Sequence, residues 1–165
     1  MRQLRWQTGV VVPAVLMVAL LLMGCPKQPT GTGVSSPSGG IAASQPAPQE
    51  FRAVEALKDV HFEFDQYDIR PAEAKILVEN ARWLKANPNS LILIEGACDE
   101  RGTGEYNLAL GDRRAKSTVH YLAAQGVQPS RMTTLSYGKE RPVCTDHTEE
   151  CWAKNRRAHF RVKAQ

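Results

Sequence analysis

The sequence lacks an apolar run of the roughly 20 residues that a helix needs to cross a bilayer. Its longest apolar stretch runs from Val10 to Met23 and is interrupted by Pro13. Arg2 and Arg5 give the chain a positively charged start ahead of this stretch. A charged start followed by a short apolar segment is typical of a signal peptide, so the sequence predicts one at its beginning.

The short motifs of several enzyme classes are also missing. The sequence has no Gly-rich phosphate loop, no Gly-x-Ser-x-Gly elbow and no pair of His residues spaced as metal ligands on one helix. Asp99 and Glu100 are adjacent, so their side chains diverge, and no second acid is placed at the separation that a glycosidase needs. We therefore predict that the protein is not an enzyme and uses no cofactor.

Neither sign of charge is in large excess. The chain has 21 Lys and Arg residues against 17 Asp and Glu residues, for a formal net charge of +4. Removing the two leader residues Arg2 and Arg5 lowers that charge by two, from +4 to +2. Nucleic-acid-binding domains usually concentrate basic residues on one face, and the pair Arg156-Arg157 is too short a run for that. The sequence therefore predicts no nucleic-acid partner.

The leader ends in a pattern that carries chemistry. Leu22-Met23-Gly24-Cys25 resembles the lipobox of bacterial lipoproteins, in which the Cys is acylated and becomes the first residue of the mature chain. We predict a signal peptide over residues 1–24 and a lipid anchor at Cys25. Pro26 follows where lipoproteins kept in the inner membrane often have Asp, which favours sorting to the outer membrane.

The composition then changes twice. Gly, Ser, Pro, Thr, Ala and Gln dominate residues 25–49, with almost no charge and no apolar periodicity. Such a composition predicts a disordered tether. Residues 50–165 regain periodic apolar residues and are long enough for one domain with a core of its own.

Apolar periodicity within that domain predicts alternating strands and helices. In Leu91–Ile94 the residues that would face both sides of a strand are apolar, which indicates a central strand. The helix after it ends at Gly126. The expected elements are a short helical lead-in at Phe51–Lys58, strands at Val60–Phe64, Leu91–Ile94, Met132–Ser136 and Ala158–Val162, a helix from Pro71 to Asn87, and a second helix that carries Asn107, Arg114 and Leu122 and stops at Gly126. The order βαβαββ predicts an α+β fold, an α/β sandwich with helices packed on one face of a mixed four-stranded sheet.

The loop after the central strand has features of a binding site. In open α/β sheets, ligands usually bind at the carboxyl ends of strands, and Gly102 and Gly104 let this loop bend. Asn107 and Arg114 are seven residues apart, so they project from one helix face. If that face turns towards the strand, Asp99 and Arg114 flank a pocket for a ligand with an ammonium and a carboxylate. The alternative is a loop-to-helix salt bridge.

Several separated motifs identify a family resemblance. They are Asp99-Glu100-Arg101-Gly102-Thr103, Glu105-Tyr106-Asn107, Leu110-Gly111, Arg113-Arg114-Ala115, Ser136-Tyr137-Gly138-Lys139-Glu140 with Pro142, and Asn155-Arg156-Arg157-Ala158. In this order they resemble the peptidoglycan-associated lipoproteins of the outer-membrane protein A-like family. The resemblance spans about Val60 to Val162 and implies the same α+β fold.

The resemblance implies non-covalent binding of peptidoglycan through the meso-diaminopimelate of its stem peptide. By motif position, Asp99 would bind the ammonium of that residue and Arg114 its carboxylate, a pair of charges that lysine lacks at its side-chain end. Asn107 and Arg101 would support the loop and the ligand. The turn at Phe64 and Asp65 would lie beside the pocket.

One departure from the family pattern is visible two places before the motif Asp. Ala97 stands where these lipoproteins commonly have His, and Cys98 replaces a small residue. The missing imidazole removes any contact that it would make to the ligand. It leaves the Asp99 and Arg114 pair untouched.

The resemblance also implies a place in the cell envelope. It suggests an outer-membrane lipoprotein with its domain in the periplasm, which binds TolB and takes part in the Tol-Pal system, envelope integrity and cell division. Two alternatives stay open, a subunit of another envelope machine and, with much less support, a peptidoglycan hydrolase.

The remaining cysteines suggest a crosslink. An exported protein enters an oxidising compartment, so Cys144 and Cys151 are predicted to form a disulfide before the last strand. Cys98 would then be a buried free thiol. The alternative is a metal site formed by Cys144, His147 and Cys151, with Cys98 as a fourth ligand, although this spacing is not an established zinc pattern.

Overall fold

The computed structural model describes residues 47–164. The predicted signal peptide, the lipid anchor at Cys25 and the predicted tether up to residue 46 lie outside these residues. No helix between residues 47 and 164 has the length and apolar character needed to cross a membrane. The elements are a 3₁₀ turn at Pro48–Glu50, β1 Arg52–Ala53, β2 Val60–His61, α1 Pro71–Ala86, β3 Ser90–Ala97, α2 Gly104–Ala124, a 3₁₀ turn at Pro129–Arg131, β4 Met132–Gly138, α3 Glu149–Asn155 and β5 Arg157–Ala164.

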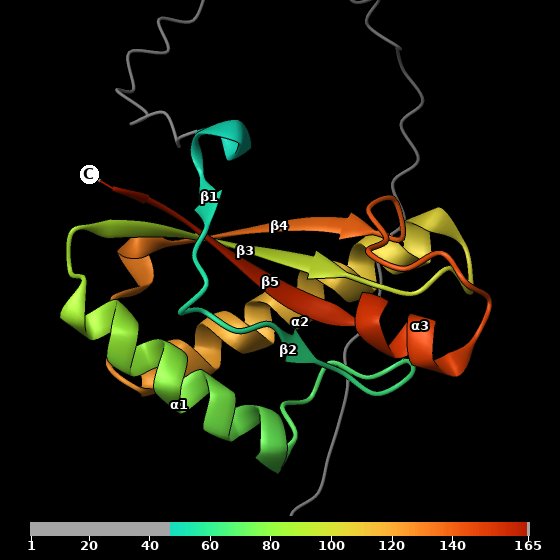
Figure 1. Ribbon diagram of the computed structural model, residues 1–165, viewed down its shortest axis with the longest axis horizontal. Helices are drawn as coiled ribbons and strands as arrows, with labels where there is room; N and C mark the ends of the chain where they lie inside the picture. The colour runs from blue at the N-terminus through green and yellow to red at the C-terminus, as the bar shows by residue number, and fades with distance from the viewer. Residues whose placement is uncertain (1–46, 165) are drawn as a thin grey trace, which may run out of the picture. The chain divides into compact units, whose positions relative to one another are not determined.

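The strands form one mixed sheet with β3 at its centre (Figure 1). β3 pairs in parallel with β4 on one side and antiparallel with β5 on the other. The outer side of β5 pairs with the two short strands β1 and β2. The α+β class and the βαβαββ core that the sequence predicts are confirmed, and the structure adds β1 as a fifth strand and α3 before β5.

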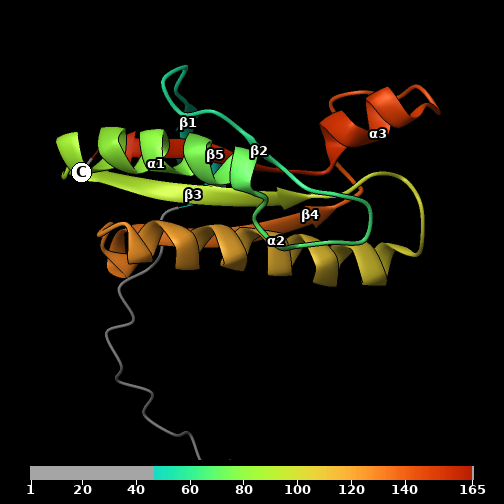
Figure 2. The same ribbon diagram turned by 90° about the horizontal axis from the view of Figure 1, so that it is seen from below.

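Helices α1 and α2 lie side by side on one face of the sheet (Figures 1 and 2). The apolar residues that the helical spacing predicts for this face are buried between the two layers. They form one cluster with side chains of β3 and β5, namely Leu77, Ala81, Leu84, Ile92, Ile94, Ala115, Leu122 and Phe160. Burial of this apolar surface drives the packing of the two layers.

Two glycines let α2 approach β3 unusually closely. A Cβ atom at Gly96 would lie 1.9 Å from the carbonyl oxygen of Gly111, and one at Gly111 would lie 2.3 Å from the hydroxyl of Ser136. No larger side chain fits at these two positions without moving the helix away from the sheet. The close contact fixes where the N-terminal half of α2 lies relative to the end of β3.

Two expectations for the secondary structure were wrong. The segment Phe51–Lys58 is not helical, because Arg52 and Ala53 pair with the outer side of β5 as β1. Residues between β4 and β5 were expected to form only a connection, but Thr148 caps a short helix there, α3, by accepting a hydrogen bond from the backbone N–H of Cys151. A seven-residue helix is too short to give a clear periodic signal.

Candidate ligand-binding site

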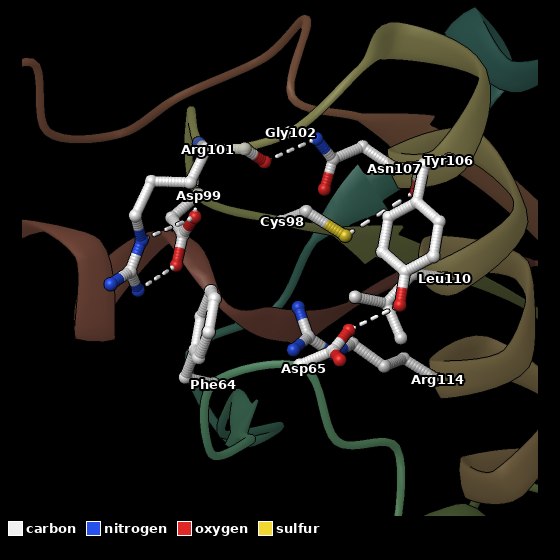
Figure 3. Close-up of a pocket in the computed structure, with 10 residues that line it drawn as sticks. All are labelled: Phe64, Asp65, Cys98, Asp99, Arg101, Gly102, Tyr106, Asn107, Leu110 and Arg114. Atoms are coloured by element: carbon white, nitrogen blue, oxygen red, sulfur yellow. Dashed lines mark hydrogen bonds and ion pairs between the residues drawn. The ribbon is translucent and has the colours of Figure 1, made fainter.

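A pocket of ≈ 160 Å³ lies at the carboxyl end of β3 (Figure 3). It is formed by the loop between β2 and α1, the loop between β3 and α2, and the first turns of α2. Its lining residues are Phe64, Asp65, Cys98, Asp99, Arg101, Gly102, Tyr106, Asn107, Leu110 and Arg114. The pocket therefore occupies the place where sheets of this kind usually bind ligands.

All six residues that the sequence singled out for binding line this one pocket: Asp99, Arg114, Asn107, Arg101, Phe64 and Asp65. Their role in binding remains a prediction. The lining also contains Cys98, Gly102, Tyr106 and Leu110, which sequence reasoning did not assign to the site. Leu110 lies three residues after Asn107 on α2, and Tyr106 lies one turn before Leu110. The helical phase of Asn107 and Arg114 is the signal that could have indicated them.

Arg114 is the largest fully buried side chain of the domain. Its guanidinium donates from all three nitrogens to backbone carbonyls: Nε to Gln66 at 2.8 Å, Nη1 to Ala97 at 3.0 Å and Nη2 to Glu63 at 3.0 Å. These bonds join α2 to the loop between β2 and α1 and to the end of β3. Burial lowers the pKa of Arg114, but an arginine stays charged at any pH of interest.

The positive charge of Arg114 forms no ion pair with a carboxylate among residues 47–164. A guanidinium has five N–H groups, of which the three carbonyls take three, so each Nη of Arg114 keeps one N–H. Figure 3 shows this guanidinium reaching into the pocket on the side opposite the Asp99 and Arg101 pair. Parallel N–H groups on two nitrogens are the fork that binds a carboxylate in two places.

Asp99 is also buried, with 5% of its side chain exposed, but it has many partners. Oδ1 accepts from the backbone N–H and from Nε of Arg101, each at 3.1 Å. Oδ2 accepts from Nη2 of Arg101 at 2.6 Å and from Nη1 of Arg156 at 3.2 Å. Burial opposes ionisation, but these hydrogen bonds outweigh it and lower the pKa of Asp99 below its ordinary value of 3.8.

The simple salt bridge between Asp99 and Arg114, which the sequence left open, is therefore wrong. Asp99 pairs with Arg101 and Arg156 instead. Arg156 was missed as a part of the site, although it stands in one of the motifs quoted above. It is 4% exposed, and its Nε donates to the carbonyl of Phe62 at 3.0 Å while its Nη2 donates to Glu149 at 2.6 Å.

Arg101 lies between two aromatic rings. Its guanidinium carbon is 4.0 Å from the centroid of the Phe64 ring and 4.2 Å from that of Trp152 on α3. The cation is therefore held by the negative faces of both rings as well as by Asp99. Its Nη2 is also 3.8 Å from a carboxylate oxygen of Glu149.

Asn107 holds the loop that carries Asp99. Its amide nitrogen donates to the carbonyls of Arg101 at 2.8 Å and Thr103 at 3.0 Å. Thr103 caps α2 by accepting from the backbone N–H of Tyr106 at 3.2 Å. Gly102 has a φ of 86°, which favours glycine, so the loop depends on that residue for its turn. The supporting role predicted for Asn107 in the loop agrees with these contacts.

The loop between β2 and α1 closes the other side of the pocket. Asp65 has a φ of 58°, a conformation that Asp tolerates better than most residues. Its carboxylate accepts a hydrogen bond from the Tyr106 hydroxyl of α2. Phe64, beside it, is 55% exposed and forms an apolar rim. The Phe64 and Asp65 turn therefore lies where the sequence placed it, beside the pocket.

The cysteines behave as the sequence predicts. Cys144 and Cys151 form a disulfide, and Cys98 is a buried free thiol in the wall of the pocket. The disulfide leaves neither sulfur as a thiolate, which removes the metal site proposed for Cys144, His147 and Cys151. Residues 47–164 contain no other cluster of metal-ligating side chains. Burial raises the pKa of the Cys98 thiol to about 11.

Comparisons with known proteins identify the family. The profile of the OmpA family matches residues 61–156, more than half of the chain. The chain belongs to the OmpA family. Among the similar proteins of this OmpA family, a peptidoglycan-associated lipoprotein from Agrobacterium fabrum is 44% identical over 151 residues, covering 88% of this chain and 85% of that protein.

Two further similar proteins agree with this result. A peptidoglycan-associated lipoprotein from Pseudomonas putida is 40% identical over 156 residues, covering 90% of this chain and 93% of that protein. The crystal structure of the peptidoglycan-associated lipoprotein from Burkholderia pseudomallei superposes with a TM-score of 0.61 at 44% identity, covering 64% of this chain and 89% of that one. The resemblance to the peptidoglycan-associated lipoproteins, inferred from the sequence motifs, is confirmed.

Proposed function

We propose that the protein binds peptidoglycan non-covalently through the diaminopimelate of the stem peptide and tethers the outer membrane to the cell wall. The observation that carries this proposal is the buried guanidinium of Arg114. Two of its N–H groups make no hydrogen bond to a described oxygen, and it forms no ion pair with a described carboxylate. The names of its relatives support the same ligand class.

The carboxylate at the side-chain end of diaminopimelate binds to Arg114. Three carbonyls already fix the guanidinium in place, so it loses little freedom when the ligand binds. Its two remaining N–H groups offer a bidentate contact to the carboxylate oxygens. Burial strengthens this contact, because the surrounding protein screens charge less than water does.

The ammonium at the same end of the ligand binds to Asp99. A carboxylate offers about four acceptor positions, and Arg101 and Arg156 occupy them in the free protein. The ammonium therefore replaces the side chain of Arg101 on Asp99, while Arg156 stays. Arg101 remains stacked between Phe64 and Trp152 and turns towards Glu149, whose carboxylate is 3.8 Å away.

The Asp99 and Arg114 ends of the pocket together would favour peptidoglycan that contains diaminopimelate over peptidoglycan that contains lysine. Diaminopimelate carries an ammonium and a carboxylate on its terminal carbon, whereas lysine carries only the ammonium. A lysine ligand leaves the Arg114 guanidinium without an anion, and an unpaired buried charge is unfavourable. The function involves no bond making or breaking, so the protein acts as a binding module and not as an enzyme.

A lipid anchor at Cys25 completes the tether. Several acyl chains on one Cys would hold the protein in a membrane leaflet, since each buried methylene contributes about 0.8 kcal/mol. The tether predicted for residues 25–49 would let the domain leave that anchor and meet the wall in the periplasm. Polar recognition gives a modest affinity per site, and many anchors along one wall compensate by multivalency.

A link to the Tol system follows from the family alone. TolB would be a protein partner, and the tether would act in envelope integrity and cell division. A subunit of another envelope machine is the second candidate, because the OmpA family includes proteins of other assemblies. Competition between TolB and purified peptidoglycan for the protein separates these two functions.

The test is pull-down of the protein on purified diaminopimelate-type and lysine-type peptidoglycan. We expect sedimentation with the first wall only, and its loss on Asp99→Asn and Arg114→Lys substitution. Circular dichroism checks that both variants are folded. Equal binding to both walls, or variants that bind like the parent, contradicts the proposal. Release of soluble muropeptides from either wall would instead indicate a hydrolase.

A further inference from the structure

A second cavity adjoins the pocket beyond Arg101, with a volume of ≈ 250 Å³. We name it the α3 cavity, since Trp152 and Asn155 of α3 form one wall. Its lining residues are Cys98, Glu100, Lys139, Pro142, Cys144, Thr145, Asp146, His147, Trp152 and Asn155. Cys98 belongs to both cavities, and the Trp152 ring contacts the Arg101 guanidinium that lines the first one.

The outer wall of the α3 cavity is fixed by covalent and hydrogen bonds. The disulfide joins Cys144 of the loop to Cys151 of α3. Asn155 accepts from the backbone N–H groups of Val143 at 2.8 Å and Cys144 at 3.2 Å, and donates to the Cys144 carbonyl at 2.7 Å. The loop therefore holds its shape without a ligand, which lowers the entropy lost on binding.

Of the charged groups of this cavity, Glu100 has two side-chain partners, whereas Lys139 has no carboxylate partner among the described residues. The carboxylate of Glu100 meets both His147, at 2.5 Å, and the indole N–H of Trp152, at 2.8 Å. Lys139 forms no ion pair with a described carboxylate, and its ammonium donates only to the carbonyls of Glu100 at 3.3 Å and Gly102 at 2.7 Å. An ammonium has three N–H donors, so Lys139 keeps one of them for a ligand.

We infer that the α3 cavity is a second subsite, in which Lys139 binds the free carboxylate of the residue joined to diaminopimelate in the stem peptide. This inference rests on the proposed function. The neighbouring residues are attached at the α-carbon of diaminopimelate, three methylene groups from the end held in the first pocket, and the two cavities share a wall. The partner residue is a γ-linked D-glutamyl residue with a free α-carboxylate, or a D-alanine with a terminal one.

Calorimetry on the full-length protein tests the inference with four ligands: free meso-diaminopimelate, γ-D-glutamyl-diaminopimelate, the α-amide of that dipeptide, and diaminopimelyl-D-alanine. We expect one of the two acidic dipeptides to bind about tenfold more tightly than free diaminopimelate, as one charged hydrogen bond allows. If the D-glutamyl dipeptide binds more tightly than free diaminopimelate and its α-amide does not, the α-carboxylate of D-glutamate is the group that Lys139 binds. A gain with D-alanine only identifies the other source.

Lys139→Met removes the charge, and Lys154→Met, an exposed lysine of α3, is the matched control. We expect Lys139→Met to abolish the tenfold gain while free diaminopimelate binds as to the parent. Lys139→Arg should restore the gain, and Lys154→Met should keep it. Equal affinity of the parent for all four ligands overturns the subsite.

A second result also overturns it. If Lys139→Met weakens free diaminopimelate as much as the dipeptide, Lys139 acts only by holding the loop between Glu100 and Gly102. A parent protein that binds none of the four ligands contradicts the proposed function itself. The two failures are therefore distinguishable.

Discussion

Substituting Arg114 by Lys keeps the charge but removes the planar fork. One ammonium nitrogen cannot meet three carbonyls that the guanidinium reaches from three different nitrogens. If it keeps one of them, two buried carbonyls lose their donor, at about 1–3 kcal/mol each. Two such carbonyls would together cost about 2–6 kcal/mol. We expect a loss of unfolding free energy of about 2–4 kcal/mol, in the lower part of this range, because water can enter the adjoining pocket and bind the freed carbonyls.

Binding of diaminopimelate should fall more than stability alone explains. The variant loses the bidentate contact to the ligand carboxylate, and charged hydrogen bonds contribute about 1.5–3 kcal/mol each. The ammonium still attracts the carboxylate, so we expect a loss of affinity of about 10–100-fold. Calorimetry with free meso-diaminopimelate measures this loss, and urea titration measures the stability.

Arg131 provides a matched control at the opposite end of β3. It also donates to three backbone carbonyls, those of Ser90, Leu84 and Asn87, at 2.7–3.2 Å, and burial also lowers its pKa. Arg131→Lys should therefore lower the unfolding free energy without weakening diaminopimelate binding at a temperature where both variants are folded.

Two outcomes refute this reasoning. If Arg114→Lys binds the ligand like the parent, Arg114 only holds the loops together and the carboxylate binds elsewhere. If Arg131→Lys weakens binding as much as Arg114→Lys does, the loss reflects general destabilisation and gives no information about the pocket.

Three further predictions concern stability, pH and reactivity. Gly96→Ala places a Cβ 1.9 Å from the Gly111 carbonyl oxygen, so we expect a loss of about 2–3 kcal/mol or more in a urea titration, and parent-like stability would contradict the close contact. Because folding lowers the pKa of Asp99, its contribution to stability is complete above its ordinary pKa of 3.8 and is lost as pH falls through the lower folded pKa. The urea midpoint of the parent should therefore stay level above about pH 5 and drop below about pH 4. The drop should be smaller in Asp99→Asn. Since the pKa of Cys98 is about 11, iodoacetamide at pH 8 should label this thiol only after unfolding, as mass spectrometry can measure.

The sequence predicted the parts of the fold that depend on repeated patterns. Residues of α1 and α2 at helical spacing, such as Leu77 and Leu122, are buried as expected, and the apolar run around Ile94 forms the central strand. β1 escaped prediction because two residues carry no period, and only β5 supplies the hydrogen bonds that make Arg52 and Ala53 a strand.

Six residues of the pocket lining were predictable from the sequence, but the ion pairs among its charged residues were not. The spacing of Asn107 and Arg114 on a helix and the position of Asp99 in the loop predicted that all three line one pocket. This was possible because spacing along a helix fixes which face a side chain occupies. The partners of Asp99 depend on where α3 and β5 return to the site, which no local pattern specifies. Arg156, 57 residues along the chain from Asp99, is the clearest example.

The two ends of the pocket are therefore prepared differently for a ligand with two charges. At the Arg114 end, the guanidinium donates to three backbone carbonyls and forms no ion pair with a carboxylate of residues 47–164, so the proposed ligand carboxylate would not have to displace an ion-pair partner. The Asp99 end already holds two guanidinium groups, so an ammonium must displace one of them. Replacing the Arg101 guanidinium by the ligand ammonium gains little free energy by itself. Most of the binding free energy would then have to come from the contact of the ligand carboxylate with Arg114. Under the proposed function, this coupling would discriminate for diaminopimelate, because a ligand with only one of the two charges would either leave Arg114 without a carboxylate or lack the ammonium that replaces Arg101.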